Sequence, residues 1–479
     1  MVSYGWMDRR EFLRIAALGA YAAGSPAWLA GEPSGLISTQ KIDITVHPDQ
    51  RLGAVPADFM GLGYEISSIA TPGVLSAANR PYVELVRRLG TRGVIRVGGN
   101  TSDYASFSAR ATAVSAPKRT VINEAGLREL AGFLDATEWS LIWGLNLGEG
   151  SVEDAVIEAR SVADAVGGRL LAFEIGNEPD LYVHEGHRPR YSYEQYLEEY
   201  RRYRSAVRAA LPPVGFAGPD AAIATDWVGR FAADEGRDLR LLTHHYYREG
   251  QNRGSTIDKL LHPDPKLAAM LDRLRAASKS SGVPYRICET NSFSGGGRPG
   301  VSDTFAAALW ALDYLCMLAW HGAGGVNMET GINQLDFVSS YSPIADDRHH
   351  HYHAAPEYYG MLAFVEGCRG ERVAVSYDAG AVNLTAYATV DAKGRPTIVI
   401  VNQDGATDAD MRIATGSGTT SASVLRLSAP SLDSKTRVTL GGAAVAADGR
   451  WRGRPESARL IDGVCSVQVP AASAAIVKL

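Results

Sequence analysis

Two glutamates that each close an apolar run are the residues of this sequence best suited to chemistry. Glu178 lies at the end of the run 169–179 (RLLAFEIGNEP), and Glu289 lies at the end of the run 283–290 (VPYRICET). Retaining hydrolysis of a glycosidic bond needs two carboxyl groups about 5–5.5 Å apart, one to attack the anomeric carbon and one to protonate the leaving oxygen. The pair is a candidate for this chemistry if the fold brings the two run ends together.

Eight short strand-like runs alternate with helix-like runs over about 300 residues, as in parallel sheets. The strand-like runs are 58–66, 91–100, 139–148, 169–179, 213–220, 238–247, 283–290 and 322–330, and helical spacing is clearest in 80–90, 151–166 and 192–211. Eight repeats predict a closed (β/α)₈ barrel over residues 55–367. A doubly wound open sheet is the alternative, but its Gly-x-Gly-x-x-Gly turn after the first strand is absent.

The C-terminal ends of barrel strands form the active site in this fold, and that rule selects further polar residues. Either glutamate alone is a weak signal, since a lone Glu at a strand end is more often a helix cap or a surface group. A second Glu three strands later makes the combination specific. The other candidates at strand ends are Tyr64, Glu65, Arg96, Asn100, Asp103, Asn146, Asn177, Asp220, His244, His245, Tyr246, Tyr247, Asn291, Asn327 and Glu329.

A third glutamate, Glu174, lies four positions before Glu178 in the same run. Side chains alternate along a strand, so both glutamates face the barrel interior, with Glu174 about 13 Å deeper than Glu178. That depth is too great for contact with a substrate. We therefore expect Glu174 to be a buried structural carboxylate, with Arg96 as its partner.

The sequence pattern changes after residue 367. From there on, short runs of alternating apolar and polar residues are separated by Gly, Asp, Asn and Pro. This pattern predicts an all-β domain, a β-sandwich, over residues 368–479. The net charge of −5 offers no basic surface for nucleic acid. The four cysteines show no metal-ligand spacing, and Cys288 beside Glu289 is interpreted as a buried structural thiol.

The N-terminal residues 1–30 have the features of an export signal. Arg9-Arg10 precede Phe12-Leu13 and an apolar stretch that ends in small residues, which indicates a twin-arginine signal with cleavage after Ala27 or Ala30. An amphipathic N-terminal helix is the alternative. The apolar run is shorter than the ~20 residues of a membrane span, and no later segment qualifies. We expect export to the periplasm or the medium.

Five stretches together resemble glycoside hydrolase family 79, which includes heparanase and bacterial β-glucuronidases. The matching stretches are 94–104 (VIRVGGNTSDY), 173–182 (FEIGNEPDLY), 243–247 (THHYY), 287–297 (ICETNSFSGGG) and 302–315 (SDTFAAALWALDYL). The family belongs to a clan of retaining (β/α)₈ glycosidases. The resemblance implies that an N-terminal strand, here residues 41–50, joins the C-terminal β-sandwich. It also implies hydrolysis of a carbohydrate substrate without cofactor or metal.

The resemblance also implies roles for individual residues. Glu178 would be the general acid/base, and Glu289 would be the nucleophile. Arg96, Tyr246 and His244 would support the ionised nucleophile. Asn177 would bind the sugar 2-hydroxyl. The remaining substrate contacts would come from Glu65, Asp103, Asn327 and Tyr341, although Asp103 could equally cap the segment after it.

The loop Ser294-Gly295-Gly296-Gly297 bears on the choice of sugar. Consecutive glycines leave N–H groups free to bind an anion, and in the family this loop receives the carboxylate of a uronic acid. Here Ser294 stands where relatives carry a tyrosine, and Glu329 stands where bacterial relatives have a histidine. The family pattern predicts a β-glucuronidase, whereas the two departures favour a neutral β-glucoside, for example of a plant phenolic.

A catalytically inactive carbohydrate-binding barrel is a third possibility, which the presence of both glutamates, Arg96 and Tyr246 disfavours. The histidine-rich run 348–353 (RHHHYH) suggests a metal site, but its spacing follows no recognised ligand pattern. We favour a polar loop at the rim of the cleft, where Tyr341 and Tyr352 could stack on sugar or aglycone. The sequence predicts no metal, no cofactor and no nucleic-acid partner, and it leaves the oligomeric state open.

Overall fold

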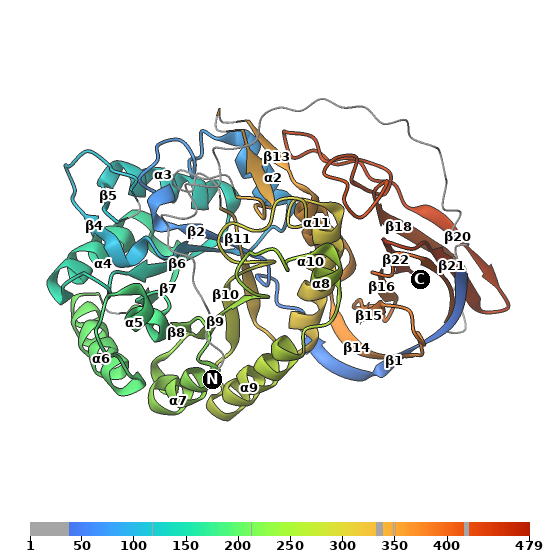
Figure 1. Cartoon of the computed structure of the whole chain (residues 1–479), viewed down its shortest axis with the longest axis horizontal. Coiled ribbons are helices and arrows are strands. Elements are labelled where there is room, and N and C mark those ends of the chain that lie inside the picture. The colour runs from blue at the N-terminus through green and yellow to red at the C-terminus, as the bar shows by residue number, and fades with distance from the viewer. Residues whose placement is uncertain are drawn as a thin grey trace. The chain divides into compact units, whose positions relative to one another are not determined.

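A computed structural model gives the fold of the chain (Figure 1). It describes residues 38–116, 118–211, 213–331, 339–347, 349, 351–415 and 421–479. The predicted export signal (residues 1–30) lies outside the described residues, as do Arg348 and His350 of the histidine-rich run.

Eight parallel strands form a barrel, and each of them overlaps one of the eight predicted runs. In chain order they are β2 (Gly61–Glu65), β3 (Val94–Gly98), β6 (Ser140–Leu145), β7 (Leu170–Ile175), β8 (Ala217–Ala221), β9 (Leu241–Tyr247), β10 (Tyr285–Asn291) and β11 (Gly325–Glu329). Hydrogen bonding links them in the order β7-β6-β3-β2-β11-β10-β9-β8. Phe173 on β7 bridges Phe216 just before β8, so the barrel is nearly closed. The predicted fold class is confirmed.

Helices follow the strands and surround the barrel (Figure 1). They are α2 (Arg80–Arg88), α3 (Glu124–Thr137), α4 (Val152–Val166), α5 (Tyr182–Glu185), α6 (Tyr193–Ala210), α7 (Thr225–Glu235), α8 (Ile257–Leu261), α9 (Pro265–Ser281), α10 (Phe305–Trp320) and α11 (Pro356–Gly367). Side chains that accept hydrogen bonds from free N–H groups start several of them. Asn123 caps α3, Ser151 caps α4, and Ser192 forms a capping box with Gln195 at the start of α6.

Helices α10 and α11 are covered on nearly all sides by other parts of the protein. This explains why apolar residues occupy nearly all sides of both helices. Almost every residue of both helices is buried. The first N–H groups of α10 have no side-chain cap. Instead, the N–H groups of Phe305 and Ala306 donate to the carbonyl oxygens of Ser434 and Leu432 in the C-terminal domain. At Gly360 the two helices meet backbone to backbone, since an added methyl would overlap the carbonyl oxygen of Ala308.

A second, mixed sheet of ten strands builds the C-terminal domain. Its strands are β1 (Ser38–Ala54), β14 (Glu371–Tyr377), β15 (Leu384–Val390), β16 (Pro396–Asn402), β17 (Thr407–Ala414), β18 (Ala422–Ser428), β19 (Thr439–Leu440), β20 (Glu456–Ile461), β21 (Val464–Val469) and β22 (Ser473–Lys478). As expected, the N-terminal strand joins this domain: β1 pairs antiparallel with β14 and parallel with β17.

The β domain closes on itself. The strand β18 pairs with β22 as well as with β20, so hydrogen bonding runs continuously around the domain. The long strand β1 contributes to this closure because it is bent. Two register shifts, between His47 and Arg51 and between Arg51 and Gly53, produce the bend. Ile42, Ile44, Val373 and Ile398 belong to a core that is separate from that of the barrel. Two small pairs complete the strands: β4 (Ala105–Phe107) with β5 (Thr120–Ile122), and β12 (Ile344–Asp346) with β13 (Tyr352–Ala354).

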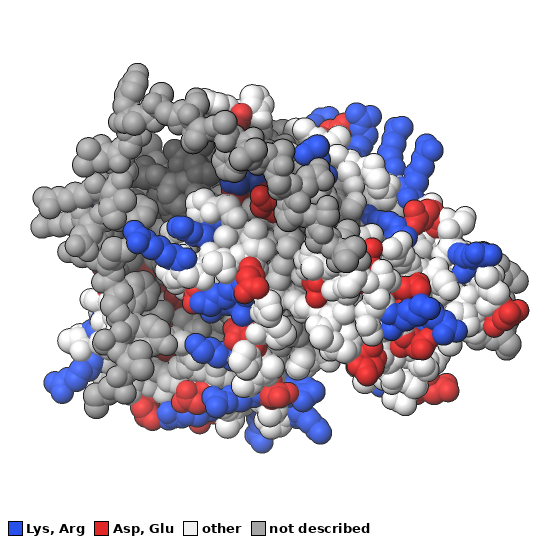
Figure 2. All heavy atoms as spheres, turned by 45° about the vertical axis from the view of Figure 1, so that its right-hand side comes forward, with Lys and Arg blue, Asp and Glu red and all other residues white. Residues whose placement is uncertain are grey.

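The described surface is mixed in charge. In the view of Figure 2, Lys and Arg side chains are interspersed with Asp and Glu, without a broad field of one sign. Among the described residues, no helix combines the length and the apolar character that crossing a membrane requires.

The close approach of α10 and α11 can be tested with one methyl group. Gly360→Ala should lower the free energy of unfolding by about 1–3 kcal/mol, because a rigid backbone carbonyl occupies the space that the methyl needs. The matched control is Gly229→Ala in α7, where no atom lies within 4 Å of the added carbon. That change should be neutral or should stabilise by up to about 1 kcal/mol, since alanine is the better helix former. Urea denaturation of both variants measures the difference, and equal stability would contradict this packing.

Candidate active site

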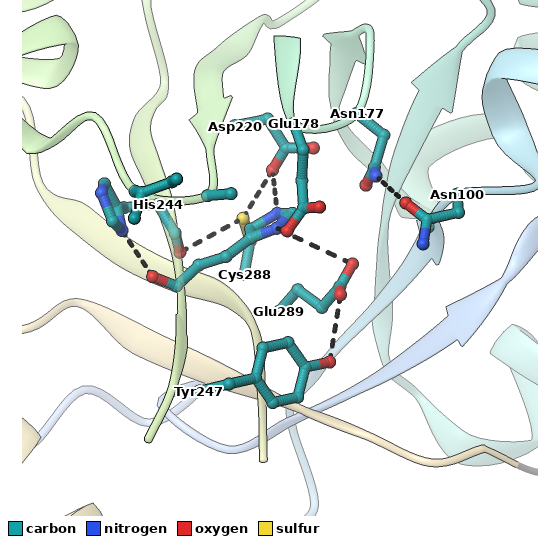
Figure 3. Close-up of polar contacts among 12 residues, drawn as sticks. Asn100, Asn177, Glu178, Asp220, His244, Tyr247, Cys288 and Glu289 are labelled. Atoms are coloured by element: carbon teal, nitrogen blue, oxygen red, sulfur yellow. Dashed lines mark hydrogen bonds and ion pairs between the residues drawn. The ribbon is translucent and has the colours of Figure 1, made fainter. Parts of the chain in front are cut away.

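Glu178 and Glu289 meet at the C-terminal mouth of the barrel (Figure 3). Glu178 lies in the turn after β7, three residues beyond its last residue, and Glu289 lies in β10. One carboxylate oxygen of each, together with a ring nitrogen of His245, lies within 4.8 Å of the other two atoms. This separation matches two carboxyl groups that act on opposite sides of one glycosidic bond with retention, because inversion would need room for a water between them.

The backbone at Glu178 is held in an unusual conformation. Its φ of 50° and ψ of 49° lie in the left-handed region, which non-glycine residues seldom adopt. The N–H of Glu178 donates to the carbonyl oxygen of Asp220 at 3.0 Å. Both oxygens of Asp180 accept N–H groups of the next strand's loop, from Ala222, Ile223 and Ala224, each at 2.8 Å. These contacts fix the turn that aims Glu178 across the mouth.

The buried guanidinium of Arg96 connects four strands under the mouth. Its Nε donates to Glu174 at 3.1 Å, and its Nη1 donates to the Oε2 of Glu289 at 2.7 Å. Its Nη2 donates to Asp220 at 2.6 Å and to the Oδ1 of Asn177 at 2.8 Å. The predicted pairing of Glu174 with Arg96 is confirmed. The same guanidinium also reaches Glu289, so its predicted contact with the candidate nucleophile is present too.

The carboxyl groups below the mouth differ in protonation. Burial raises the pKa of Glu174 to about 7, and the charge of Asp220 adds to this, although Arg96 opposes it. Burial also disfavours ionisation of Asp220, but the positive charges of Arg96 and His245 outweigh it and hold the pKa of Asp220 below its usual range. Asp220 is therefore the carboxylate that stays ionised in this interior.

His245 links Asp220 to Glu178. Its Nε2 lies 2.8 Å from the Oδ1 of Asp220, and its Nδ1 lies 2.8 Å from the Oε1 of Glu178. Burial alone would lower the pKa of His245, but the negative charges of Asp220 and Glu289 raise it well above its ordinary value. The imidazolium can donate from both nitrogens at once, which satisfies both carboxyl groups.

The predicted support from His244 is wrong, because neighbouring residues of a strand face opposite sides. The ring of His244 turns away from the mouth, and its Nδ1 contacts the carbonyl oxygen of His245 (Figure 3). Burial lowers the pKa of His244 to about 4. The residue that contacts Glu178 and Glu289 is His245.

The predicted support from Tyr246 is wrong for the same reason, because the contact comes from the next residue of the strand. Its hydroxyl donates to Asp264 at 2.9 Å, and its ring stacks on Tyr314 outside the barrel. Tyr247 instead donates to the Oε1 of Glu289 at 3.0 Å (Figure 3). The polar residue Thr243 indicates which face of β9 lies inside the barrel, because side chains alternate along a strand and positions 243, 245 and 247 share one face. Its hydroxyl accepts the N–H of Asp220 inside the barrel.

Two predicted substrate contacts, Asp103 and Asn327, are engaged with the protein itself. Asp103 is 1% exposed and accepts hydrogen bonds from the N–H groups of Leu147, Gly148 and Asn177 and from the hydroxyl of Tyr182. It therefore positions Asn177 rather than a sugar. Asn327 is fully buried two residues below Glu329, where it accepts from Arg286 and donates to Leu62 and Val94. The partners of Asn327 contradict its predicted substrate contact, and those of Asp103 favour the structural one of the two roles left open for it.

Glu65 and Asn177 lie at the mouth with part of their polar groups occupied. Glu65 accepts from the N–H of Asn100 and from the N–H and hydroxyl of Thr101. Burial raises its pKa to about 7. The Nδ2 of Asn177 donates to the Oδ1 of Asn100 at 3.1 Å. These contacts tie the loop after β3 to the end of β2 and to the segment after β7.

Glu329 lies at the end of β11, between the strands β2 and β10 that carry Glu65 and Glu289. Its side chain packs against Gly63, where an added carbon would overlap its carboxyl group. Burial, together with the negative charges of Glu289 and Glu65, raises the pKa of Glu329 well above its usual value. The environment therefore favours the neutral form of this carboxyl group.

The glycine loop after β10 adopts the conformation of an anion-binding turn. Gly295, Gly296 and Gly297 have φ values of 76°, 87° and 79°. No acceptor among the described residues binds their N–H groups. Ser294 is held by backbone bonds to Glu249 and Gln251. Tyr341 packs beside Gly297, and its ring stacks on Tyr247 with 6.2 Å between centroids.

Two sets of side chains in the described part of the chain are close enough to share a metal ion. One set is Asp220, His245 and Cys288, and the other is Glu178, His245 and Glu289. Both overlap the network around Arg96, where Cys288 donates to Asp220 at 2.8 Å. In the histidine-rich run, the Nδ1 of His351 pairs with Asp347 at 2.7 Å.

Comparisons with known proteins match one family model and two curated relatives. Residues 382–476 match the family described as "Glycosyl hydrolase family 79 C-terminal beta domain". A β-glucuronidase of Aspergillus niger is 28% identical over 352 residues, which are 65% of this chain and 64% of that protein. A β-glucuronidase of Neurospora crassa is 28% identical over 316 residues, or 57% of this chain and 56% of that protein. The chain thus aligns with less than two thirds of either curated relative.

Solved structures share the fold at lower sequence identity. A 4-O-α-L-rhamnosyl-β-D-glucuronidase from Fusarium oxysporum 12S superposes with a TM-score of 0.74 at 19% identity, covering 92% of this chain and 100% of that one. A family 51 arabinofuranosidase from Xanthomonas axonopodis pv. citri gives a TM-score of 0.67 at 16% identity, covering 92% and 99%.

The adjacent histidines offer a test of the site's electrostatics. In protein labelled with ¹⁵N-histidine, the His245 ring should carry two protons well above the ordinary histidine pKa of about 6.5, because Asp220 and Glu178 accept from both nitrogens. The His244 ring should stay neutral until the pH approaches about 4. Imidazole ¹⁵N shifts, assigned with His244→Gln and His245→Gln variants, measure both. A neutral His245 at about pH 6 would contradict the network.

Proposed function

Because this chain belongs to glycoside hydrolase family 79, we propose that it is a retaining β-glycosidase that hydrolyses β-glucuronides. One observation carries the mechanism: carboxylate oxygens of Glu178 and Glu289 lie within 4.8 Å of each other, the arrangement suited to double displacement. The two curated relatives are β-glucuronidases, and this supports the choice of sugar.

Glu289 acts as the nucleophile in this proposal. Arg96 donates to one of its oxygens and Tyr247 donates to the other. Both donors orient the carboxylate for attack on the anomeric carbon. Attack forms a glycosyl ester on Glu289 and releases the leaving oxygen on the opposite side.

Glu178 supplies the proton that the leaving oxygen needs. Burial raises its pKa, and the charge of Glu289 raises it further, although the hydrogen bond and charge of His245 oppose the shift. Once Glu289 is esterified its charge is gone, so the pKa of Glu178 falls. The same group then works as a base on the water that hydrolyses the ester.

The uronate carboxylate would be received by the N–H groups of Gly295, Gly296 and Gly297. Three consecutive left-handed glycines point successive N–H dipoles at one anion. Glu329 is compatible with this role because the rise in its pKa favours the neutral carboxyl group. A neutral carboxyl group can donate a hydrogen bond to the uronate instead of repelling it.

A neutral β-glucoside is the second candidate substrate. Ser294 in place of the tyrosine expected from the family removes one possible donor to a uronate, which favours this alternative. An inactive carbohydrate-binding barrel is less well supported, since Arg96 and Tyr247 both orient Glu289 as a nucleophile requires.

We also propose export through the twin-arginine route. Arg9-Arg10, Phe12-Leu13 and the short apolar stretch after them support it. This route carries proteins after folding, in keeping with a large barrel and a closed β domain.

A side-by-side assay of 4-nitrophenyl β-glucuronide and 4-nitrophenyl β-glucoside tests the choice of sugar. We expect kcat/KM to favour the glucuronide by about 100-fold or more, because a site built to bind a carboxylate leaves its donors unpaired with the neutral sugar. Preference for the glucoside would show that Ser294 and Glu329 have changed the pocket. Hydrolysis of neither would support the inactive barrel.

The acid role of Glu178 predicts a dependence on the leaving group. Glu178→Ala should slow hydrolysis of a β-glucuronide with an alkyl aglycone by about 10²–10⁴-fold, the usual contribution of a general acid. A dinitrophenyl glucuronide, which needs no proton to depart, should be cleaved into glycosyl-enzyme at a nearly unchanged rate. Azide should then accelerate turnover of that substrate and give a β-glycosyl azide. Equal loss with both aglycones would remove Glu178 from this role.

A further inference from the structure

Helices α10 and α11 run side by side in the same direction with matching register. Ala308 of α10 meets Gly360 of α11, where the absence of a side chain lets the backbones touch. Cys316 lies eight residues after Ala308, and Cys368 lies eight residues after Gly360. Eight residues are just over two helical turns, or about 12 Å, so the facing sides of both helices meet again at the cysteines.

The two thiols are in direct contact at that point. Their sulfur atoms are 3.4 Å apart, and both side chains are buried. The remaining cysteines have other surroundings, since Cys288 contacts Asp220 under the active site and Cys465 lies in the core of the β domain. Cys368 is held at the C-terminal end of α11, where its N–H donates to the carbonyl oxygen of Phe364.

We propose that Cys316 and Cys368 are a site of oxidative cross-linking, at which a disulfide joins α10 to the end of α11. Disulfide sulfurs lie about 2.05 Å apart, so closing the bond from 3.4 Å requires about 1.4 Å of combined movement. Rotation about the Cα–Cβ bonds and a small adjustment at the end of α11 supply movement of this size. The packing at Gly360 already holds the two helices close together.

The oxidant in this proposal is a low-molecular-weight disulfide such as oxidised glutathione. One cysteine thiolate attacks a sulfur of that disulfide, forms a mixed disulfide and releases one thiolate. The second cysteine thiolate attacks the protein sulfur of the mixed disulfide and releases the other. Two electrons pass to the oxidant, and the two protons lost by Cys316 and Cys368 leave with the two released thiols.

The cross-link would stabilise the side of the active site that β11 provides. The cysteines are 52 positions apart, and the chain between them contains Glu329 and Tyr341 at the mouth. Beyond Cys368 the chain enters the β domain, where Gly367 already packs against Val399 and Ile476. A bond at this point restricts the unfolded chain and adds stability to the junction between α10 and the β domain.

Burial determines when the bond can form. It raises the pKa of the Cys316 thiol well above its usual value, so the thiol reacts slowly in the folded chain. Oxidation should therefore proceed during folding, or slowly through opening of the helix pair.

The test counts thiols after refolding the full chain from urea with reduced and oxidised glutathione. Alkylation in denaturant should find two free thiols instead of four, and the mass before alkylation should fall by about 2 Da. Digestion that cleaves both between Cys288 and Cys316 and between Cys316 and Cys368 should yield a linked pair of peptides that contains Cys316 and Cys368. Four free thiols, or a link through Cys288 or Cys465, would overturn the proposal.

Matched variants separate the cross-link from general effects of losing a thiol. Cys368→Ser and Cys316→Ser should each abolish the loss of two thiols, whereas Cys465→Ser should keep it. Oxidised wild-type protein should melt about 2 °C or more above its reduced form, and Cys465→Ser should show the same difference. A Cys368→Ser protein that still lost two thiols would contradict the assignment. Because the count on the unaltered chain stands alone, an unstable variant does not decide the result.

Discussion

The buried guanidinium of Arg96 is the interaction on which the rest of the site depends. It is fully buried and bonded to Glu174, Asp220, Asn177 and Glu289. A buried charge is tolerable only when carboxylates and hydrogen bonds surround it, and removing one partner leaves the others uncompensated. Because its partners come from three further strands or strand ends of the barrel, Arg96 fixes their relative heights. The contacts that hold these strands together therefore also set the geometry of the candidate active site.

The charges around Arg96 explain how two similar carboxyl groups acquire opposite tasks. Asp220 is ionised between Arg96 and His245, and it keeps His245 protonated. His245 then donates to Glu178, while Arg96 and Tyr247 donate to Glu289. Glu289, with two donors of its own, is oriented for the proposed attack. Burial and the charge of Glu289 raise the pKa of Glu178, which suits it to the proposed role of proton source.

Much of this arrangement could be predicted from the sequence, and the errors share a physical cause. The strands and the Glu174–Arg96 pair follow from alternation along apolar runs. His244 and Tyr246 were assigned to the wrong face because β9 is buried on both sides, so hydrophobicity does not mark its interior face. Asn327 was placed at the mouth because residue type does not reveal depth within a barrel. The contact between Cys316 and Cys368 was missed because it depends on how two helices pack, which no local pattern encodes.

Covalent trapping tests the central claim, that Glu289 is the nucleophile of a β-glucuronidase, most directly. A 2-deoxy-2-fluoro-β-glucuronyl fluoride should inactivate the enzyme, since the fluorine slows hydrolysis of the glycosyl ester more than a good leaving group slows its formation. Peptide mass spectrometry should then find a single fluoroglucuronyl group on Glu289. A label on Glu178 or on another residue would contradict the account, as would active enzyme that turns over glucuronides yet never becomes labelled.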